Sequence, residues 1–166
     1  MSAYDWSKFK CRITIDAPPE KIYIAWSTRH GLESWFLRRS ELSTTTGELR
    51  GMKETVRPSD TYEWYWHGYP DTTVERGSFL DANGYDLIRF TFAKVCIVTV
   101  TIFREEGEMI CELVQSQIPE DESSKVQYHL GCSLGWTFYL ANLKSILEGG
   151  IDLRNKNESV REVVNA

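Results

Sequence analysis

The sequence lacks several features that would place a protein in a function class at once. No stretch approaches 18 consecutive apolar residues, so we expect no membrane-spanning helix. The N-terminus lacks the basic and then apolar pattern of a signal peptide, which indicates a cytoplasmic protein. Lys and Arg number 19 against 24 Asp and Glu, a formal net charge of −5, and no basic stripe is present. This balance argues against a nucleic-acid partner.

Motifs for metal binding and for nucleophilic catalysis are also missing. The four cysteines form no CxxC pair, the three histidines lie far apart, and no histidine is near a cysteine in zinc-site spacing. We therefore expect buried free thiols, no metal site and no cofactor. There is no GxSxG, HExxH, P-loop or GxGxxG motif, so no catalytic residue is assigned.

Aromatic residues, by contrast, are plentiful. Trp, Tyr and Phe make up 13% of 166 residues, which is a length suited to one domain. Aromatic side chains carry large apolar areas, so they could build a large core. A large core is the favoured interpretation, and the alternative is an aromatic-lined pocket, because ligand pockets are mostly apolar with a few polar groups.

The first third of the chain predicts one strand and two short helices. Apolar residues alternate loosely over 8–15, which indicates a half-buried strand. Pro19 suits the first turn of a helix that extends to about Trp26. Ser27 or Thr28 can cap a second short helix, which carries an apolar face.

Six further strands are predicted between residues 40 and 118. Their expected ranges are 40–48, 62–67, 72–80, 87–92, 95–103 and 109–118. Asn83-Gly84 is a strong hairpin signal, and most of the loops are short, so neighbouring strands should pair antiparallel. The strand period places Trp64 and Trp66 on one face.

A long helix is predicted over residues 123–148 and is terminated by Gly149-Gly150. Two apolar stripes run along it, one through Leu130 and Leu134 and one through Trp136, so we expect the helix to be largely covered. Residues 1–154 then form a single domain, and the polar segment 155–166 is a mobile tail. The antiparallel sheet must cover its apolar face, and only the long helix is large enough to cross it. The prediction is an α+β fold of six to seven strands, curved around the terminal helix with space between them.

Four stretches resemble a known family in order and spacing: Ile15–Trp26, Trp35-Phe36, Val114–Pro119, and Gly135-Trp136 leading into Leu140–Glu148. The order of elements is similar to the helix-grip fold of the START and birch-pollen-allergen superfamily. Within it, the chain most resembles the bacterial single-domain form of the family named for the activator of the heat-shock-protein-ninety ATPase. This resemblance implies a hydrophobic cavity between sheet and terminal helix. Members of the superfamily include lipid carriers, polyketide cyclases and aromatases, and a chaperone co-factor domain.

Candidate cavity residues follow from strand phase, helix position and the resemblance. They are Trp64, Trp66, His67, Phe90, Phe92, Val98, Val100, Gln115, Tyr128, Gly131, Leu134, Gly135 and Phe138. Whether the Trp64–Trp66 pair lines the cavity or packs outside it is left open. Glycine in a helix suggests that a side chain would not fit at that position. Either sheet backbone packs closely against the helix there, or the position borders the cavity.

Polar residues beside these positions could orient a ligand: Glu63, His67, Arg89, Gln115 and Tyr128. For each of these residues taken alone, a solvent-facing or cross-strand-paired side chain is the favoured interpretation. His67 is the best general-base candidate, with Glu63 or Tyr128 as its partner, because its ordinary pKa lies near neutral.

Three functions remain in competition at this stage. The first is a non-enzymatic protein that binds a small hydrophobic molecule in the cavity. The second is an enzyme of the cyclase or aromatase kind, which needs two facing titratable groups. The third is a module that contacts a chaperone. Because the eukaryotic co-chaperone has an additional N-terminal domain, we expect no stimulation of the chaperone ATPase by this chain alone.

Overall fold

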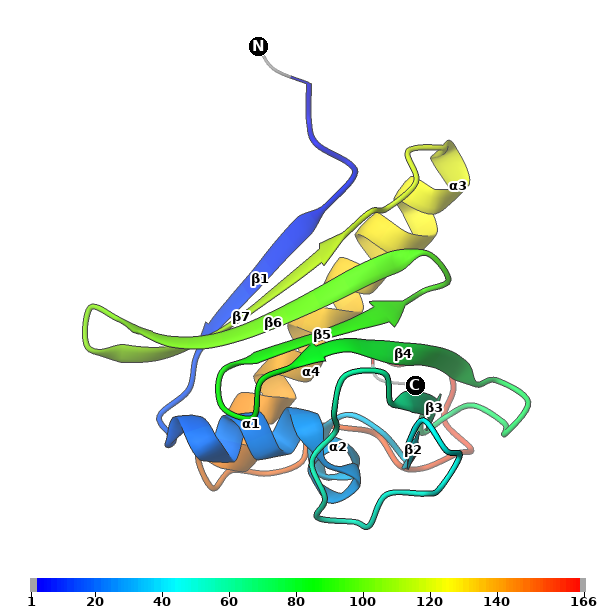
Figure 1. Cartoon of the computed structure of the whole chain (residues 1–166). Coiled ribbons are helices and arrows are strands. Elements are labelled where there is room, and N and C mark those ends of the chain that lie inside the picture. The colour runs from blue at the N-terminus through cyan, green and yellow to red at the C-terminus, as the bar shows by residue number, and fades with distance from the viewer. Residues whose placement is uncertain (1–2, 165–166) are drawn as a thin grey trace.

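A computed structural model describes residues 3–164 and shows one antiparallel sheet with a long helix across it (Figure 1). The strands are β1 (Phe9–Thr14), β2 (Arg39–Ser43), β3 (Thr61–Tyr65), β4 (Glu75–Ala82), β5 (Leu87–Phe92), β6 (Cys96–Glu105) and β7 (Glu108–Ser116). The helices are α1 (Pro19–Ser27), α2 (Arg29–Trp35), α3 (Glu122–Ser124), the π-helix η1 (Lys125–Gly131) and α4 (Cys132–Leu147).

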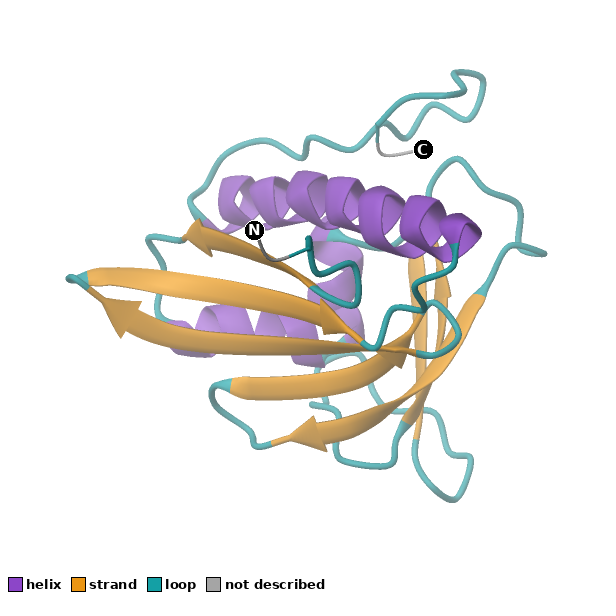
Figure 2. Cartoon of the chain, turned by 90° about the horizontal axis from the view of Figure 1, so that it is seen from above, coloured by secondary structure: helices purple, strands orange, loops and turns teal. Residues whose placement is uncertain are grey.

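The sheet has seven strands in the order β1-β7-β6-β5-β4-β3-β2, and every neighbouring pair is antiparallel. All sequential neighbours from β2 to β7 pair directly, whereas β1 pairs with β7, far along the chain. Figure 2 shows α4 lying across one face of the curved sheet, with α1 and α2 at one end. The predicted α+β helix-grip fold is therefore confirmed.

Some predicted strand ends are wrong. β2 stops at Ser43 instead of residue 48, because Thr44 and Gly47 turn the chain: the Thr44 hydroxyl accepts backbone N–H bonds, and Gly47 has φ +84°. β3 stops at Tyr65 instead of residue 67. Residues 66–74 therefore form a loop between β3 and β4, and this loop is important for the site described below.

The terminal helix runs from Glu122 to Leu147 without a break, within a residue of its predicted bounds, but its second segment is a π-helix. In that segment, His129 is buried, and its two ring nitrogens lie 2.9 Å from the Tyr4 hydroxyl and from the Trp6 carbonyl. The wider π turn accompanies this contact with the N-terminal arm, which sequence periodicity does not reveal. None of the helices within residues 3–164 is long and apolar enough to cross a lipid bilayer.

The expectation that the terminal helix is largely covered is wrong for the first half of one stripe, whereas Phe138 and Ala141 farther along the same stripe are half-buried. Trp136, Leu140 and Leu143 pack against the sheet and are buried. Leu130 and Leu134 remain exposed, because the sheet meets only one side of the helix. The apolar period identifies both stripes but does not say which of them faces the sheet.

Aromatic side chains make up much of the core between helices and sheet. Trp26, Trp35, Trp64, Phe79 and Phe90 are each at most 1% exposed. Their rings meet mainly edge-on, for example Trp26 with Trp35 at 4.7 Å and Trp64 with Phe90 at 5.2 Å between centroids. The interpretation of the aromatic content as a large core is confirmed for these residues.

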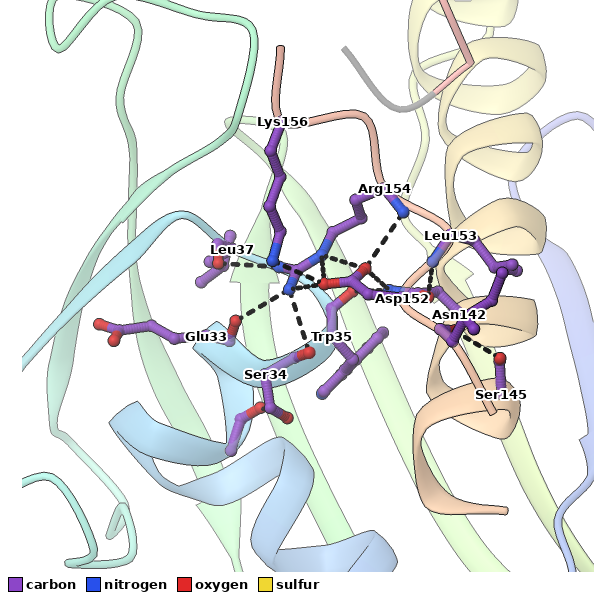
Figure 3. A network of polar contacts seen from close by, with 12 residues as sticks. Glu33, Ser34, Trp35, Leu37, Asn142, Ser145, Asp152, Leu153, Arg154 and Lys156 are labelled. Carbon is purple, nitrogen blue, oxygen red and sulfur yellow. Dashed lines mark hydrogen bonds and ion pairs between the residues drawn. The ribbon is translucent and has the colours of Figure 1, made fainter. Parts of the chain in front are cut away.

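A buried polar network fixes the chain just after α4 (Figure 3). The Asn142 amide donates to the Trp35 carbonyl at 2.7 Å and to Asp152 at 3.1 Å. Arg154 forms a bidentate pair with Asp152 and also donates to three carbonyls at the end of α2 and just beyond it, those of Glu33, Ser34 and Leu37. This network joins the end of α4 to the end of α2.

Opposing effects act on the Asp152 carboxyl. Burial raises the pKa of Asp152, but hydrogen bonds from Arg154 and Lys156 outweigh burial and hold that pKa well below its usual range. The carboxylate is therefore charged at every pH near neutral, and its pair with Arg154 persists there. After this point the tail reaches the loop after β3, where Arg161 donates to the Gly68 carbonyl. Residues 165–166 of the predicted tail lie outside the described residues.

Replacing Arg154 tests the importance of this network for stability. The Arg154 side chain is 2% exposed, so Arg154→Ala leaves a partly buried carboxylate and three carbonyls without their donor. We expect the free energy of unfolding in urea to fall by about 3–5 kcal/mol. Lys156 is the matched control, since it also pairs with Asp152 but is 53% exposed. Lys156→Ala should cost less than about 1 kcal/mol. Equal losses for the two variants would contradict a buried anchor.

Candidate functional site

An apolar groove of about 370 Å³ lies along one side of α4. One wall comes from η1 and α4: Gln127, Gly131, Cys132, Leu134, Gly135, Trp136 and Tyr139. The other wall comes from the end of α2, from β5 and from the loop after β3: Phe36, Trp66, Tyr69, Thr73 and Phe92. Val164 of the tail completes the lining.

Local sequence explains why space remains here. β3 ends at Tyr65, so Trp66 and the loop that follows no longer pair with a neighbouring strand. On the helix side, Gly135 has no side chain, and apart from its chain neighbours and the helix's own backbone no atom lies within 4 Å of the place where a Cβ would be. Of the two explanations for a helix glycine, close backbone packing and open space, the structure shows the second at Gly135.

Trp136 is the anchor of the groove as well as part of its wall. Its ring centroid lies 5.0 Å from that of Phe36 and 5.2 Å from that of Phe92. Trp136 therefore packs against two residues of the opposite wall. Its Nε1–H donates to the Gln115 side-chain oxygen at 3.0 Å, and the Gln115 amide donates to the Tyr128 carbonyl at 3.1 Å. Gln115 and Tyr128 thus support the groove from the sheet side and from η1, and neither is part of its lining.

The structure divides the predicted cavity residues into two groups. Five line the groove: Trp66, Phe92, Gly131, Leu134 and Gly135. The others lie elsewhere: Trp64, Phe90, Val98 and Val100 in the core, Gln115 and Tyr128 behind Trp136, Phe138 against the ring of Tyr139, and His67 in the loop after β3. The Trp64–Trp66 pair is therefore divided: Trp64 belongs to the core, and Trp66 belongs to the wall of the groove.

Several predicted polar residues have ordinary structural partners. Glu63 accepts from Arg76 on the neighbouring strand and from the Tyr65 hydroxyl. Arg89 lies half-buried in β5, opposite Thr99 of β6. Neither residue lines the groove.

His67 is only partly exposed, and this partial burial is the largest cause that lowers its pKa. The positive charges of Arg154, Lys156 and Arg38 lower it further, while Asp152 opposes them. Within residues 3–164, no carboxylate hydrogen bonds to this ring. The arrangement favours a neutral imidazole at neutral pH.

Sequence reasoning missed much of the lining: Phe36, Tyr69, Thr73, Gln127, Cys132, Tyr139 and Val164, and it placed Trp136 only as an anchor. A helical face of spacing i, i+3, i+4, i+7 joins Cys132, Gly135, Trp136 and Tyr139, and it could have identified the helix wall. No comparable signal marks Tyr69 or Thr73, because they belong to a loop.

The groove presents no charged side chain. Its lining contains no Asp, Glu, Lys, Arg or His. Burial raises the pKa of Cys132 to about 11, and burial likewise raises the pKa of Tyr139 well above its ordinary value. Both groups are therefore protonated at neutral pH, and the groove is an uncharged, largely aromatic surface suited to apolar molecules.

Enlarging Gly135 tests whether the space is real. Gly135→Ala removes the conformational cost of a helix glycine and should raise the free energy of unfolding by about 0.5–1 kcal/mol. Gly135→Leu should also remain folded, with an unchanged or higher melting temperature, because its side chain extends into the groove. If Gly135 instead packed against other atoms, the leucine would overpack the site and cost about 1–3 kcal/mol. Differential scanning calorimetry of both variants separates these outcomes.

The pKa of His67 gives a second test. We expect its ring signals in an NMR titration to report a pKa below 6.5, with His67→Gln used to assign them. The unfolded chain then binds a proton more readily than the folded one, so stability falls as pH drops through 6.5 towards the folded pKa. His67→Gln should flatten the stability profile in this window. A measured pKa above 6.5 would contradict this account, because it would mean that Asp152 outweighs both burial and the nearby cations.

Comparison with solved structures places this fold among bacterial proteins of similar length. Protein SSP2350 from Staphylococcus saprophyticus gives a TM-score of 0.66 at 18% identity, covering 89% of this chain and 96% of its own. The Aha1 dimer from Colwellia psychrerythraea gives a TM-score of 0.64 at 19% identity, covering 86% of this chain and 97% of its own. Protein NE0264 from Nitrosomonas europaea gives a TM-score of 0.67 at 11% identity, covering 89% of this chain and 97% of its own. At these identities the likeness shows the fold alone.

Comparison with curated proteins found no match. A family model, described as Activator of Hsp90 ATPase homolog 1-like protein, matches residues 16–148. The matched range extends from the turn before α1 through the end of α4, so it includes the whole sheet except β1 and nearly all of the groove. The chain therefore belongs to the family of Activator of Hsp90 ATPase homolog 1-like proteins.

Proposed function

We propose that this protein binds a small, largely apolar molecule in the groove beside α4. The observation that carries the proposal is the open space at Gly135 between aromatic walls. A volume of about 370 Å³ lies within the range of small-molecule pockets, roughly 300–1,000 Å³. Walls from α4, α2 and β5 are held in place by the buried Trp136, so the groove is formed before any ligand arrives.

The size of the groove also limits the affinity. A ligand that buries about 250 Å² of apolar surface gains about 6 kcal/mol at roughly 25 cal/mol per Å². Immobilising the ligand costs part of this gain. A simple hydrocarbon should therefore bind in the micromolar to millimolar range. Tighter binding would need polar contacts in addition.

Binding is favoured over cyclase or aromatase chemistry. Such an enzyme needs two titratable groups that face the same substrate with separated pKa values. The groove lining supplies no carboxylate and no histidine, and His67 lies outside it. The proposed role of the protein is therefore that of a carrier or sensor of its ligand and not that of a catalyst.

The family name also raises a chaperone as partner. The groove fits a small molecule better than a protein surface, so chaperone contact is not part of the proposal. The proposal does include a cytoplasmic location, as the sequence predicts. Four free cysteines, two of them buried, suit a reducing compartment.

Saturable binding of an apolar fluorescent probe tests the proposal. We expect one binding event per chain, and we expect Gly135→Leu to weaken it at least about tenfold because the leucine occupies the space. Thr137→Leu is the control: it adds the same side chain to α4 at an exposed position that points away from the groove, towards Cys11. Native mass spectrometry of freshly purified protein should show any retained ligand as added mass. Equal probe binding by both variants would place the site elsewhere.

A further inference from the structure

Tyr139 is a buried polar residue of the groove without a partner. It is 9% exposed and lines the groove, yet within residues 3–164 its hydroxyl makes no hydrogen bond. The hydroxyl is not one of the fully buried unpaired polar atoms, so it keeps access to the open side of the groove, where water or a ligand can bind it. The contacts of its ring are apolar, with Phe36 at 4.9 Å and Phe138 at 5.3 Å between centroids. The hydroxyl is therefore a ready hydrogen-bonding group for whatever occupies the groove.

One end of the groove, which we call the polar end, brings together polar-tipped aromatic rings. Trp66 and Tyr139 both contact the ring of Phe36, so these two polar-tipped rings gather at this end. At the other end, Phe92 and Cys132 pack on the apolar cluster around Cys96, and the exposed Gln127 adds an amide side chain to the lining. A ligand with a polar group at one end of an apolar body matches this division.

The chemistry of the polar end favours a hydrogen-bond acceptor. An indole Nε1–H can only donate, and that of Trp66 has no partner in the described chain. The Tyr139 hydroxyl can donate as well, and its raised pKa keeps the proton on it. A carbonyl oxygen can accept from such donors, whereas a group that only donates can pair with the tyrosine alone.

The lack of charge in the walls limits the ligand further. An ion in this groove would lose water without gaining an opposite charge among the lining residues, which is costly. Cations beyond the lining already have partners: Arg154 pairs with Asp152, Arg38 pairs with Asp71, and Arg161 of the tail donates to the Gly68 carbonyl. The acceptor is therefore part of a neutral molecule and not a carboxylate.

We propose that the ligand is an uncharged, mainly apolar molecule that carries a carbonyl-type acceptor, which the Tyr139 hydroxyl binds at the polar end of the groove. This inference rests on the proposed binding function and adds the ligand's chemical class to it.

Three naphthalenes of nearly equal size test the class. They are 2-acetylnaphthalene, which has a neutral carbonyl, 2-ethylnaphthalene, which has no polar group, and 2-naphthoate, which is an anion. We expect the ketone to bind about 3- to 10-fold more tightly than the hydrocarbon, as one net hydrogen bond provides, and the carboxylate to bind most weakly. Tyr139→Phe keeps the ring and should reduce the ketone's affinity to that of the hydrocarbon. Isothermal titration calorimetry measures all three.

Tyr128→Phe is the matched control, because Tyr128 lies behind the groove and does not line it. It should leave the ketone preference intact, and circular dichroism of both variants verifies their folding. Tightest binding of the carboxylate, or an unchanged ketone preference in Tyr139→Phe, would overturn the inference while leaving the binding function standing. Failure of all three compounds to bind would overturn both.

Discussion

The placement of Trp136 between sheet, α2 and loop governs the rest of the structure. Its ring touches Phe36, Phe92 and Trp26, and its buried N–H has one partner, Gln115 of β7. A buried indole that lost this partner would carry an unpaired donor, so the rotation of α4 about its own axis is fixed. Once this rotation is set, Gly135 and Tyr139 must face the gap beside the helix. The groove is thus a consequence of helix orientation and not of a separate insertion.

Features determined by near neighbours in the chain could be predicted from the sequence. The Asn83 side chain accepts three backbone N–H groups of its own turn, and Gly84 takes φ +89°, as the hairpin signal indicates. Thr28 caps α2 by accepting from the Gly31 N–H at 2.9 Å. Gly149 follows α4 with φ +80°, which ends the helix. In each case the relevant atoms lie within four residues.

Features that depend on distant contacts could not be predicted in this way. The loop after β3 brings Tyr69 and Thr73 to the groove, although no periodic pattern marks them. Arg154 is buried only because α2 ends where its carbonyls can meet it, more than 110 residues away in sequence. The exposed Leu134 and the buried Trp136 have equally apolar sequence environments, and only the position of the sheet separates them. Sequence patterning thus predicts the elements, while the site depends on how they meet.

The pairing of β1 with β7 has a consequence for synthesis on the ribosome. Thr14 pairs with Ile110, so β1 has no partner strand until about 100 more residues have been made. At roughly 5–20 residues per second, this wait lasts about 5–20 s. During that time the first strand, with its apolar face, is exposed beside the growing chain, while β2 to β6 can already pair in order. The N-terminal strand is therefore the part of this protein most in need of protection before release.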